Sequence, residues 1–152
     1  MEFHRSLQLY TDGASRGNPG DAGIGVIIKK GDAVIAAVSE YIGSTTNNVA
    51  EYTALIRGLR EVQKIFQTIK TVIKTDRVDV FLDSELIVKQ LNGTYKVRSP
   101  HLIPLWKEAR LLLNSLNCSI RHIPREENFE ADKLANDGID AKVGRVAAPL
   151  KA

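Results

Sequence analysis

The hydrophobic pattern of this chain changes period near residue 47, and this change limits the possible folds more than any other feature. Before it, Ser6–Thr11 places alternate residues on two faces, and Ile24, Val26 and Ile28 alternate within Ala22–Lys30. A hairpin turn at Lys30-Gly31-Asp32 then leads to a third strand, Ala33–Ile42. After the change, apolar residues from Val49 to Phe66 recur at helical spacing. The chain therefore begins with three strands, which we expect to form an antiparallel meander, and continues with a helix.

The remaining chain alternates between strands and helices. We expect a strand at Val78–Asp83, helices at Ser84–Leu91 and Leu102–Leu116, a strand at Ser119–Ile123 and a last helix at Glu127–Asp137 that ends at Gly138. A right-handed crossover through the first helix places the fourth strand parallel to the first and beside it. The sequence predicts an α/β domain with one mixed sheet, in which two parallel strands follow three antiparallel ones. The connection from Gln67 to Arg77 has no assignable pattern.

Composition narrows the class of protein. The 152 residues suit one domain, which we place at residues 1–139, with a tail at 140–152. Cys118 is the single cysteine, which fits a reducing, cytoplasmic setting. No apolar run is long enough to span a membrane, and Met1–Arg5 does not resemble the start of a secretory signal. A net charge of +3 permits a polyanionic partner without indicating one.

Asp12 stands between the first predicted strand and a glycine-rich stretch that ends in Asn18-Pro19-Gly20. We expect an open loop from Gly13 to Gly20, because glycine and proline favour tight turns that expose backbone N–H groups. A carboxylate at this end of a strand lies where ligands approach α/β sheets. Taken alone, Asp12 is more simply interpreted as an ordinary turn residue.

Three further acidic residues are candidates for the same site. Asp83 ends the fourth strand, so it lies near Asp12 if the first and fourth strands are neighbours. Glu51 begins its helix and points to the packed side, although the helix dipole alone would also favour a Glu there. Asp132 stands among small and apolar residues of the last helix. Converging carboxylates repel one another, and a hard divalent cation such as Mg²⁺ removes that penalty.

Four segments of the chain share both their residues and their order with one enzyme family. These segments are Thr11–Gly20, Thr46–Glu51, Phe81–Ser84 and Pro124–Asp132. Together they resemble ribonuclease HI, and the resemblance extends over roughly Ser6 to Gly138. It implies the ribonuclease H-like α/β fold, a five-stranded mixed sheet with helices on both faces.

The resemblance also implies an activity, that of an endonuclease cutting the RNA strand of RNA–DNA hybrids. The products would carry 5′-phosphate and 3′-hydroxyl ends. Asp12, Glu51, Asp83 and Asp132 match the family's four metal-binding carboxylates. Two Mg²⁺ ions about 4 Å apart would activate a water and stabilise the leaving oxygen, with Mn²⁺ as a candidate substitute.

Short polar residues match the family's substrate contacts. The positions that contact the hybrid are Gly13, Ser15, Asn18, Asn47 and Asn48, and Thr46 matches a residue that holds a DNA phosphate. Short amides and hydroxyls can reach 2′-hydroxyl groups and minor-groove base edges. The Asn pair can equally cap the helix that follows, and the two roles are compatible.

The chain departs from the family pattern between Leu91 and Leu102, where no extra basic helix is present. Lys96, Arg98 and Lys107 offer at most a weaker contact with phosphates, and a solvated basic face is an equal alternative. Glu85 stands where the family has Gln, which puts a neutral hybrid contact there in doubt.

The loop before Asp132 is a further departure, because it is shorter than the family loop that carries a catalytic His. His122 lies on the same side of its strand as Cys118 and Ile120, so we expect it to have a structural role. Arg125 is better placed in the loop, and we assign it a catalytic role. We expect the remaining histidines, His4 and His101, at the surface.

Two other functions remain open from the sequence. A non-cleaving hybrid-binding module is disfavoured, because four carboxylates would only weaken the binding of an anionic ligand without metal. A related nuclease on the same fold is disfavoured because Gly13-Ala14 follows Asp12, whereas exonucleases of this type carry Asp-x-Glu. We expect a monomer, and the sequence leaves open whether double-stranded RNA is also cut.

Overall fold

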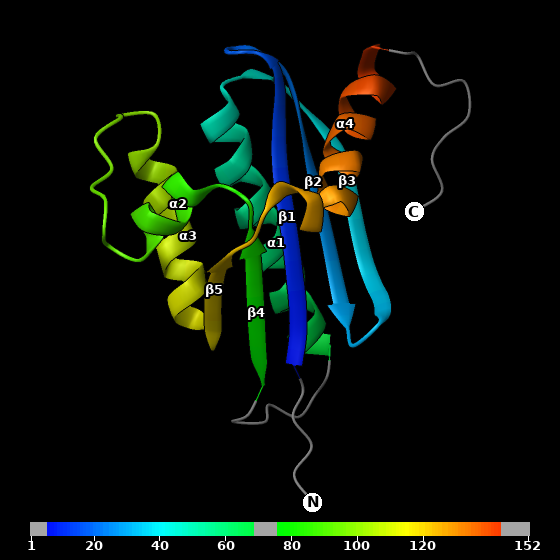
Figure 1. Ribbon diagram of the computed structural model, residues 1–152. Helices are drawn as coiled ribbons and strands as arrows, with labels where there is room; N and C mark the ends of the chain where they lie inside the picture. Colours follow the sequence, from blue (N-terminus) through cyan, green and yellow to red (C-terminus); the bar gives the residue numbers. More distant parts are fainter. Residues whose placement is uncertain (1–5, 69–75, 144–152) are drawn as a thin grey trace, which may run out of the picture.

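A mixed sheet and the helices packed on it make up the part of the chain that this computed structural model describes, residues 6–68 and 76–143 (Figure 1). In chain order the elements are β1 (Ser6–Gly17), β2 (Gly20–Lys30), β3 (Ala33–Thr45), α1 (Asn47–Thr68), β4 (Arg77–Leu82), α2 (Glu85–Leu91), α3 (Ile103–Ser115), β5 (Cys118–His122), the 3₁₀ turn η1 (Arg125–Glu127) and α4 (Phe129–Val143). Every helix and strand predicted from the sequence is present.

The strand order confirms the predicted topology. The sheet runs β3-β2-β1-β4-β5, as Figure 1 shows from right to left. The β1–β2 and β2–β3 pairs are antiparallel, whereas β1–β4 and β4–β5 are parallel. In this register Tyr10 pairs with Phe81, and their rings stack with centroids 4.8 Å apart. The first and fourth strands are therefore neighbours at the position where Asp12 and Asp83 follow.

Helices cover both faces of the sheet, as predicted. On one face, Gly58 of α1 packs against the side chains of Leu9 and Thr11. On the other face, the backbone of α4 at Ala131 lies against Gly25 of β2. The larger core forms on the α1 side, where fully buried Leu9, Tyr52 and other apolar side chains meet residues from α2 and α3. Burial of this apolar surface supplies most of the driving force for folding.

The predicted open loop from Gly13 to Gly20 is wrong. β1 continues through this stretch and pairs with β2 as far as Gly17 opposite Gly20, so the turn is confined to residues 18 and 19. Asp12 therefore lies inside a paired strand, opposite Gly25. Gly13 serves the contact between elements rather than a turn, because a Cβ there would collide with the backbone of Ala50 in α1.

The predicted end of the last helix at Gly138 is also wrong. α4 continues to Val143, so the expected boundary between residues 139 and 140 falls inside the helix. A Cβ at Gly138 would lie 2.7 Å from the backbone of Glu40 in β3. The glycine permits close contact between helix and sheet instead of ending the helix.

The segments that connect the helices and strands are only partly described. Gln67 and Thr68 belong to α1, and residues 69–75 of the unassigned connection lie outside the described part, as does the tail from residue 144. The segment between α2 and α3 is irregular, as predicted. Among the described residues, no helix is both long and apolar enough to cross a membrane.

Candidate active site

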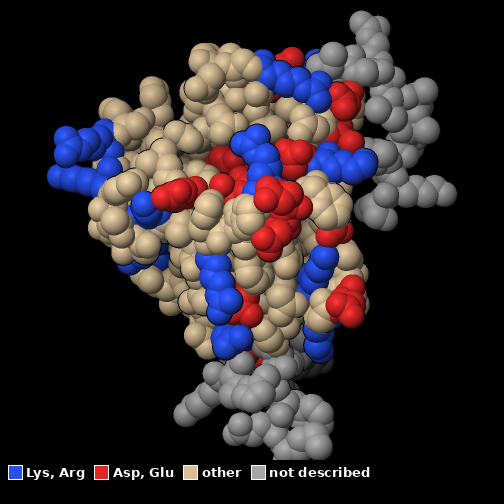
Figure 2. Space-filling model, in the orientation of Figure 1, with Lys and Arg blue, Asp and Glu red and all other residues tan. Residues whose placement is uncertain are grey.

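Three carboxylates from different elements converge on one edge of the sheet. Asp12 lies in β1, Glu51 lies one turn into α1, and Asp83 follows directly after β4. One oxygen of each lies within 4.8 Å of the other two. Asp12 is 5% exposed and Glu51 is 6% exposed, while Asp83 is half-buried. Figure 2 shows acidic side chains gathered in the middle of this face with Lys and Arg around them.

Glu51 reaches this site because Gly13 lets α1 approach the sheet. The position of Gly13 leaves no room for a side chain between β1 and the backbone of Ala50 and Glu51. Because the helix lies so close to the strand, the backbone N–H of Gly13 donates a hydrogen bond to the carboxylate of Glu51. Gly13 itself is buried, so its first role is to position Glu51.

The protonation of Asp12 and Glu51 differs from that of ordinary carboxyl groups. Burial, followed by the charges of Glu51 and Asp83, raises the pKa of Asp12 well above its usual range. Burial also raises the pKa of Glu51, although its hydrogen bond with Asp12 opposes this shift. Without a cation the cluster retains a proton near neutral pH, and a bound cation would displace that proton.

Asp132 lies beside the triad without being one of its three members. It is half-buried on the first turn of α4, and its carboxyl group contacts that of Asp12, which also raises the pKa of Asp12. The amide of Asn136 donates to the backbone oxygen of Asp132 at 3.0 Å and lies 3.4 Å from its carboxylate. The fourth predicted carboxylate thus borders the site next to Asp12.

Arg125 and His122 both lie near the cluster at the surface. Arg125 is exposed in η1, and its positive charge lowers the pKa of Glu51 against the larger effect of burial. His122 is exposed at the end of β5, with Nε2 3.3 Å from the backbone oxygen of Asp83. The expectation that His122 has a structural role is not supported, because β5 ends there and leaves the ring outside the core.

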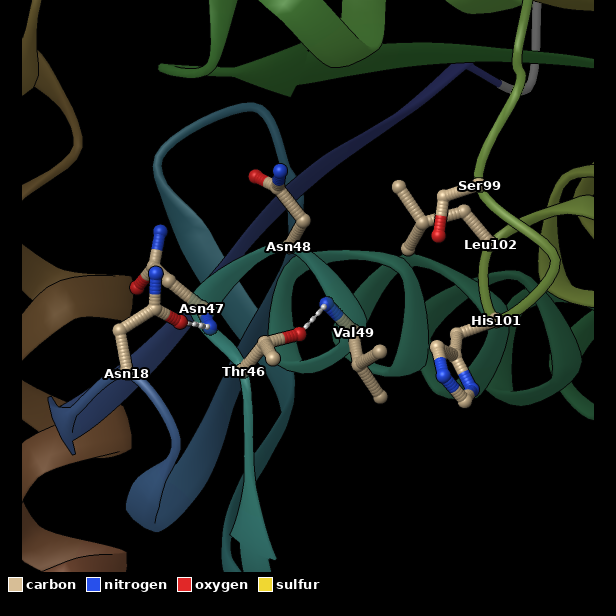
Figure 3. Close-up of a pocket in the computed structure, with 8 residues that line it drawn as sticks. All are labelled: Asn18, Thr46, Asn47, Asn48, Val49, Ser99, His101 and Leu102. Carbon is tan, nitrogen blue, oxygen red and sulfur yellow. Dashed lines mark hydrogen bonds between the residues drawn. The ribbon is translucent and has the colours of Figure 1, made fainter.

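An open cavity of about 380 Å³ lies at the start of α1. Its lining residues are Asn18, Thr46, Asn47, Asn48, Val49, Ser99, His101 and Leu102 (Figure 3). Thr46 Oγ1 accepts a hydrogen bond from the N–H of Val49, and Asn18 Oδ1 accepts one from the N–H of Asn47. Both bonds satisfy free donors at the helix start. The side chains that cap the helix are therefore those of Thr46 and Asn18, whereas the expectation named Asn47 and Asn48. Ser15, by contrast, is half-buried in β1 and does not line this cavity.

Comparisons with known proteins connect this geometry to one family. A family model described as reverse transcriptase-like matches residues 10–138. A ribonuclease H of Marinobacter nauticus is 33% identical over 146 residues, which cover 86% of this chain and 92% of that protein. The chain belongs to the ribonuclease H family. All three triad carboxylates lie within the region that the family model matches.

Two other relatives match most of this chain but differ in how much of their own length the match covers. LC11-RNase H1, isolated from compost by a metagenomic approach, is 43% identical with a TM-score of 0.83, and the match covers 91% of this chain and 99% of that one. A bifunctional protein of Mycobacterium tuberculosis is 40% identical over 143 residues, or 92% of this chain. This chain spans only 37% of the length of that mycobacterial protein.

Two features distinguish this chain from the ribonuclease H pattern described above. The segment between α2 and α3 holds no additional helix, and its Lys96 and Arg98 are exposed. Glu85, at the start of α2, is exposed and forms an ion pair with Lys89 at 2.7 Å. This pair lowers the pKa of Glu85, which agrees with the doubt about a neutral hybrid contact at this position.

The sequence missed three residues at or near the site. Ser99 and His101 come from the α2–α3 segment and face the Asn residues of α1 across the cavity (Figure 3). Asn128 is buried directly before α4, and its amide donates to Asp83. Asn128 lies inside one of the four family-like segments, so its presence was visible in the sequence while its contact was not.

Proposed function

We propose that this chain is a metal-dependent endonuclease that hydrolyses the RNA strand of RNA–DNA hybrids and leaves 5′-phosphate and 3′-hydroxyl ends. The observation that carries the proposal is the triad of Asp12, Glu51 and Asp83, in which Asp12 and Glu51 are buried and Asp83 is half-buried. Family membership supports it, and LC11-RNase H1 has a crystal structure in complex with an RNA/DNA hybrid at 44% identity to this chain.

The donor set fits hard divalent cations. Three carboxylates supply oxygen ligands within 4.8 Å of one another, as Mg²⁺ prefers. Burial and mutual repulsion raise the pKa of Asp12, which is the penalty that a bound cation offsets. We assign Asp12, Glu51, Asp83 and Asp132 as ligands for two Mg²⁺ ions, with Mn²⁺ as a substitute. When bound, such ions activate a water and stabilise charge on the leaving oxygen.

The other residues of the site bind and orient the substrate. We assign the cavity at the start of α1 to a DNA phosphate, which Thr46 would hold, while Asn18, Asn47 and Asn48 contact the hybrid. Their amides are short and neutral, so they can hydrogen bond to 2′-hydroxyl groups and base edges. We assign contacts with the same strands to Gly13 and Ser15 of β1. Arg125 would attract the scissile phosphate through its permanent charge.

The setting of this activity is also part of the proposal. We propose a ribonuclease H domain that extends beyond the expected boundary at residue 139 to the end of α4 at Val143, and that acts as a monomer in the cytoplasm. Burial raises the pKa of the Cys118 thiol to about 11, so this cysteine stays neutral, as suits a reducing compartment. Double-stranded RNA is a further substrate to test, because its 2′-hydroxyl groups offer the same contacts on both strands.

Asp83→Asn tests the assignment of the site. We expect cleavage of a hybrid to be abolished, because the central metal ligand loses its charge. We expect the melting temperature without metal to hold or rise, because carboxylate repulsion is relieved. The measurements are hybrid cleavage at saturating Mg²⁺ and melting in a chelator. Substantial activity in Asp83→Asn would remove Asp83 from the ligand set.

A further inference from the structure

Asn128 is a buried polar residue that joins β1, the strand of Asp12, to Asp83 directly after β4. It is 1% exposed and lies between η1 and α4. Its Nδ2 donates to the backbone oxygen of Thr11 in β1 at 2.9 Å and to Asp83 Oδ2 at 3.1 Å. A backbone oxygen can only accept, so the contact with Thr11 fixes which side of the amide carries the nitrogen. Both amide hydrogens are therefore used at the site, one by the backbone oxygen of Thr11 and one by the carboxylate of Asp83.

The backbone of Asn128 extends this link to the remaining side of the site. Its N–H donates to the oxygen of Arg125 at 2.9 Å, and its own oxygen accepts from the N–H of Asp132 at 3.1 Å. One residue therefore contacts Asp83 directly and holds the chain on which Arg125 and Asp132 stand. Glu51 reaches the site by a separate route, through its hydrogen bond from Gly13.

The amide is not there simply to fill space. Asn128 Oδ1 and Thr11 Oγ1 are buried and have no hydrogen-bond partner among the described residues. Buried polar atoms without partners destabilise a fold, and an apolar side chain of similar size would remove one of them. Asn at this position is therefore explained by its two donated bonds, one to the buried backbone oxygen of Thr11 and one to Asp83.

We propose that Asn128 is a positioning residue that fixes the carboxylate of Asp83 for metal binding, an inference that rests on the proposed function. The bond to Asp83 Oδ2 restrains rotation of the carboxylate and does not occupy Oδ1. An Asp carboxylate at position 128 has no hydrogen to donate, so its oxygens would face the acceptor oxygens of Thr11 and Asp83. It would also add a negative charge beside Asp83. Removing a residue that hydrogen bonds to a metal ligand commonly lowers metal affinity or activity by about 10- to 100-fold.

The experiment compares Asn128→Asp, Asn128→Leu and Asn128→Ser with the parent protein. Asn128→Leu keeps the size and removes both donors, and Asn128→Ser restores one donor. Asn114→Asp, on the exposed surface of α3, makes the same chemical change away from the site. The readouts are melting in a chelator, calorimetric titration with Mg²⁺ in the absence of nucleic acid, and kcat and KM on a labelled hybrid.

We expect Asn128→Asp and Asn128→Leu to weaken Mg²⁺ binding by about 10-fold and to lower kcat by about 10- to 100-fold, with KM for the hybrid nearly unchanged. Asn128→Ser should recover part of both losses, and Asn114→Asp should behave as the parent. If Asn128→Leu and Asn128→Asp bind Mg²⁺ and turn over as the parent does while Asp83→Asn is inactive, the positioning role is wrong and the proposed function stands. Loss of activity with unchanged Mg²⁺ affinity would also overturn it. An active Asp83→Asn would instead overturn the site itself.

Discussion

At the scale of single residues, Arg125 is the side chain whose role is tested most simply. Arginine stays charged at all working pH values, so it cannot act as a general base. We expect Arg125→Ala to lower kcat by about 10- to 100-fold, because the metal site retains the main chemical task. Arg125→Lys should recover part of the loss, since the charge remains without the planar fork. The measurements are kcat at saturating Mg²⁺ and the melting temperature.

His122→Ala is the matched comparison for Arg125→Ala. Both side chains are exposed near the triad, and the His122 ring lies 3.3 Å from the backbone oxygen of Asp83. We expect His122→Ala to retain most of its turnover and its melting temperature, because the ring is outside the core. Near-complete inactivation by His122→Ala beside an unaffected Arg125→Ala would show that the histidine performs the role assigned to Arg125.

Residue patterns identified the acids of the site but not the contacts that hold them. Asp12, Glu51 and Asp83 were selected from the sequence, and the structure brings these three together. Asn128 was missed because its role depends on a backbone oxygen 117 positions away, which local sequence does not encode. His122 was misjudged because alternation predicts the side of a strand and not where its packed part ends.

At the scale of elements, glycines set how closely the helices approach the sheet. A Cβ at Gly25 would collide with the backbone oxygen of Ala131 in α4. We expect Gly25→Ala to destabilise the fold by about 1–3 kcal/mol, which is typical of overpacking. Because α4 carries Asp132, the shift should also lower hybrid cleavage. The measurements are the melting temperature and kcat of the variant.

Gly93→Ala is the control for Gly25→Ala. Gly93 has a φ of 87°, with no atom within 4 Å of an added Cβ, so alanine there meets backbone strain and no neighbour. We expect a modest loss of stability, about 1 kcal/mol, with unchanged kcat. Equal loss of kcat in both variants would contradict the link between α4 packing and activity.

Hydrophobic period predicted the elements and their pairing, because the three early strands and the first helix carry strong patterns. The extents of β1 and α4 were predicted wrongly for one reason. Gly13 was interpreted as part of a loop and Gly138 as a helix end, whereas both occupy close contacts between helix and sheet. A glycine required by packing and a glycine required by a turn have the same sequence signal.

At the scale of the whole molecule, the triad makes stability depend on pH when no metal is bound. The folded state raises the pKa of Asp12 and of Glu51, so it holds protons that the unfolded chain releases. The unfolding free energy should therefore fall as pH rises from about 4, the ordinary carboxyl range, through the raised folded-state pKa. Melting in a chelator across this range measures the effect.

Asp12→Asn and added Mg²⁺ are the two controls for this pH dependence. Asp12→Asn removes the shifted carboxyl, so we expect a flatter pH profile and a higher melting temperature at alkaline pH; each kcal/mol gained corresponds to about 2–4 °C. Mg²⁺ should flatten the parent profile, because the cation replaces the protons. An identical slope in parent and Asp12→Asn would show that Asp12 does not carry a shifted proton.

The central claim is that this chain cuts RNA within a hybrid by means of a metal site, and one digestion tests it most directly. An RNA–DNA hybrid labelled separately on each strand is incubated with and without Mg²⁺, beside duplex DNA, and the fragment ends are mapped. We predict internal cuts in the RNA strand alone, only with Mg²⁺, that leave 5′-phosphate and 3′-hydroxyl ends. Comparable cutting of duplex DNA, or an intact hybrid at saturating Mg²⁺, would contradict the claim.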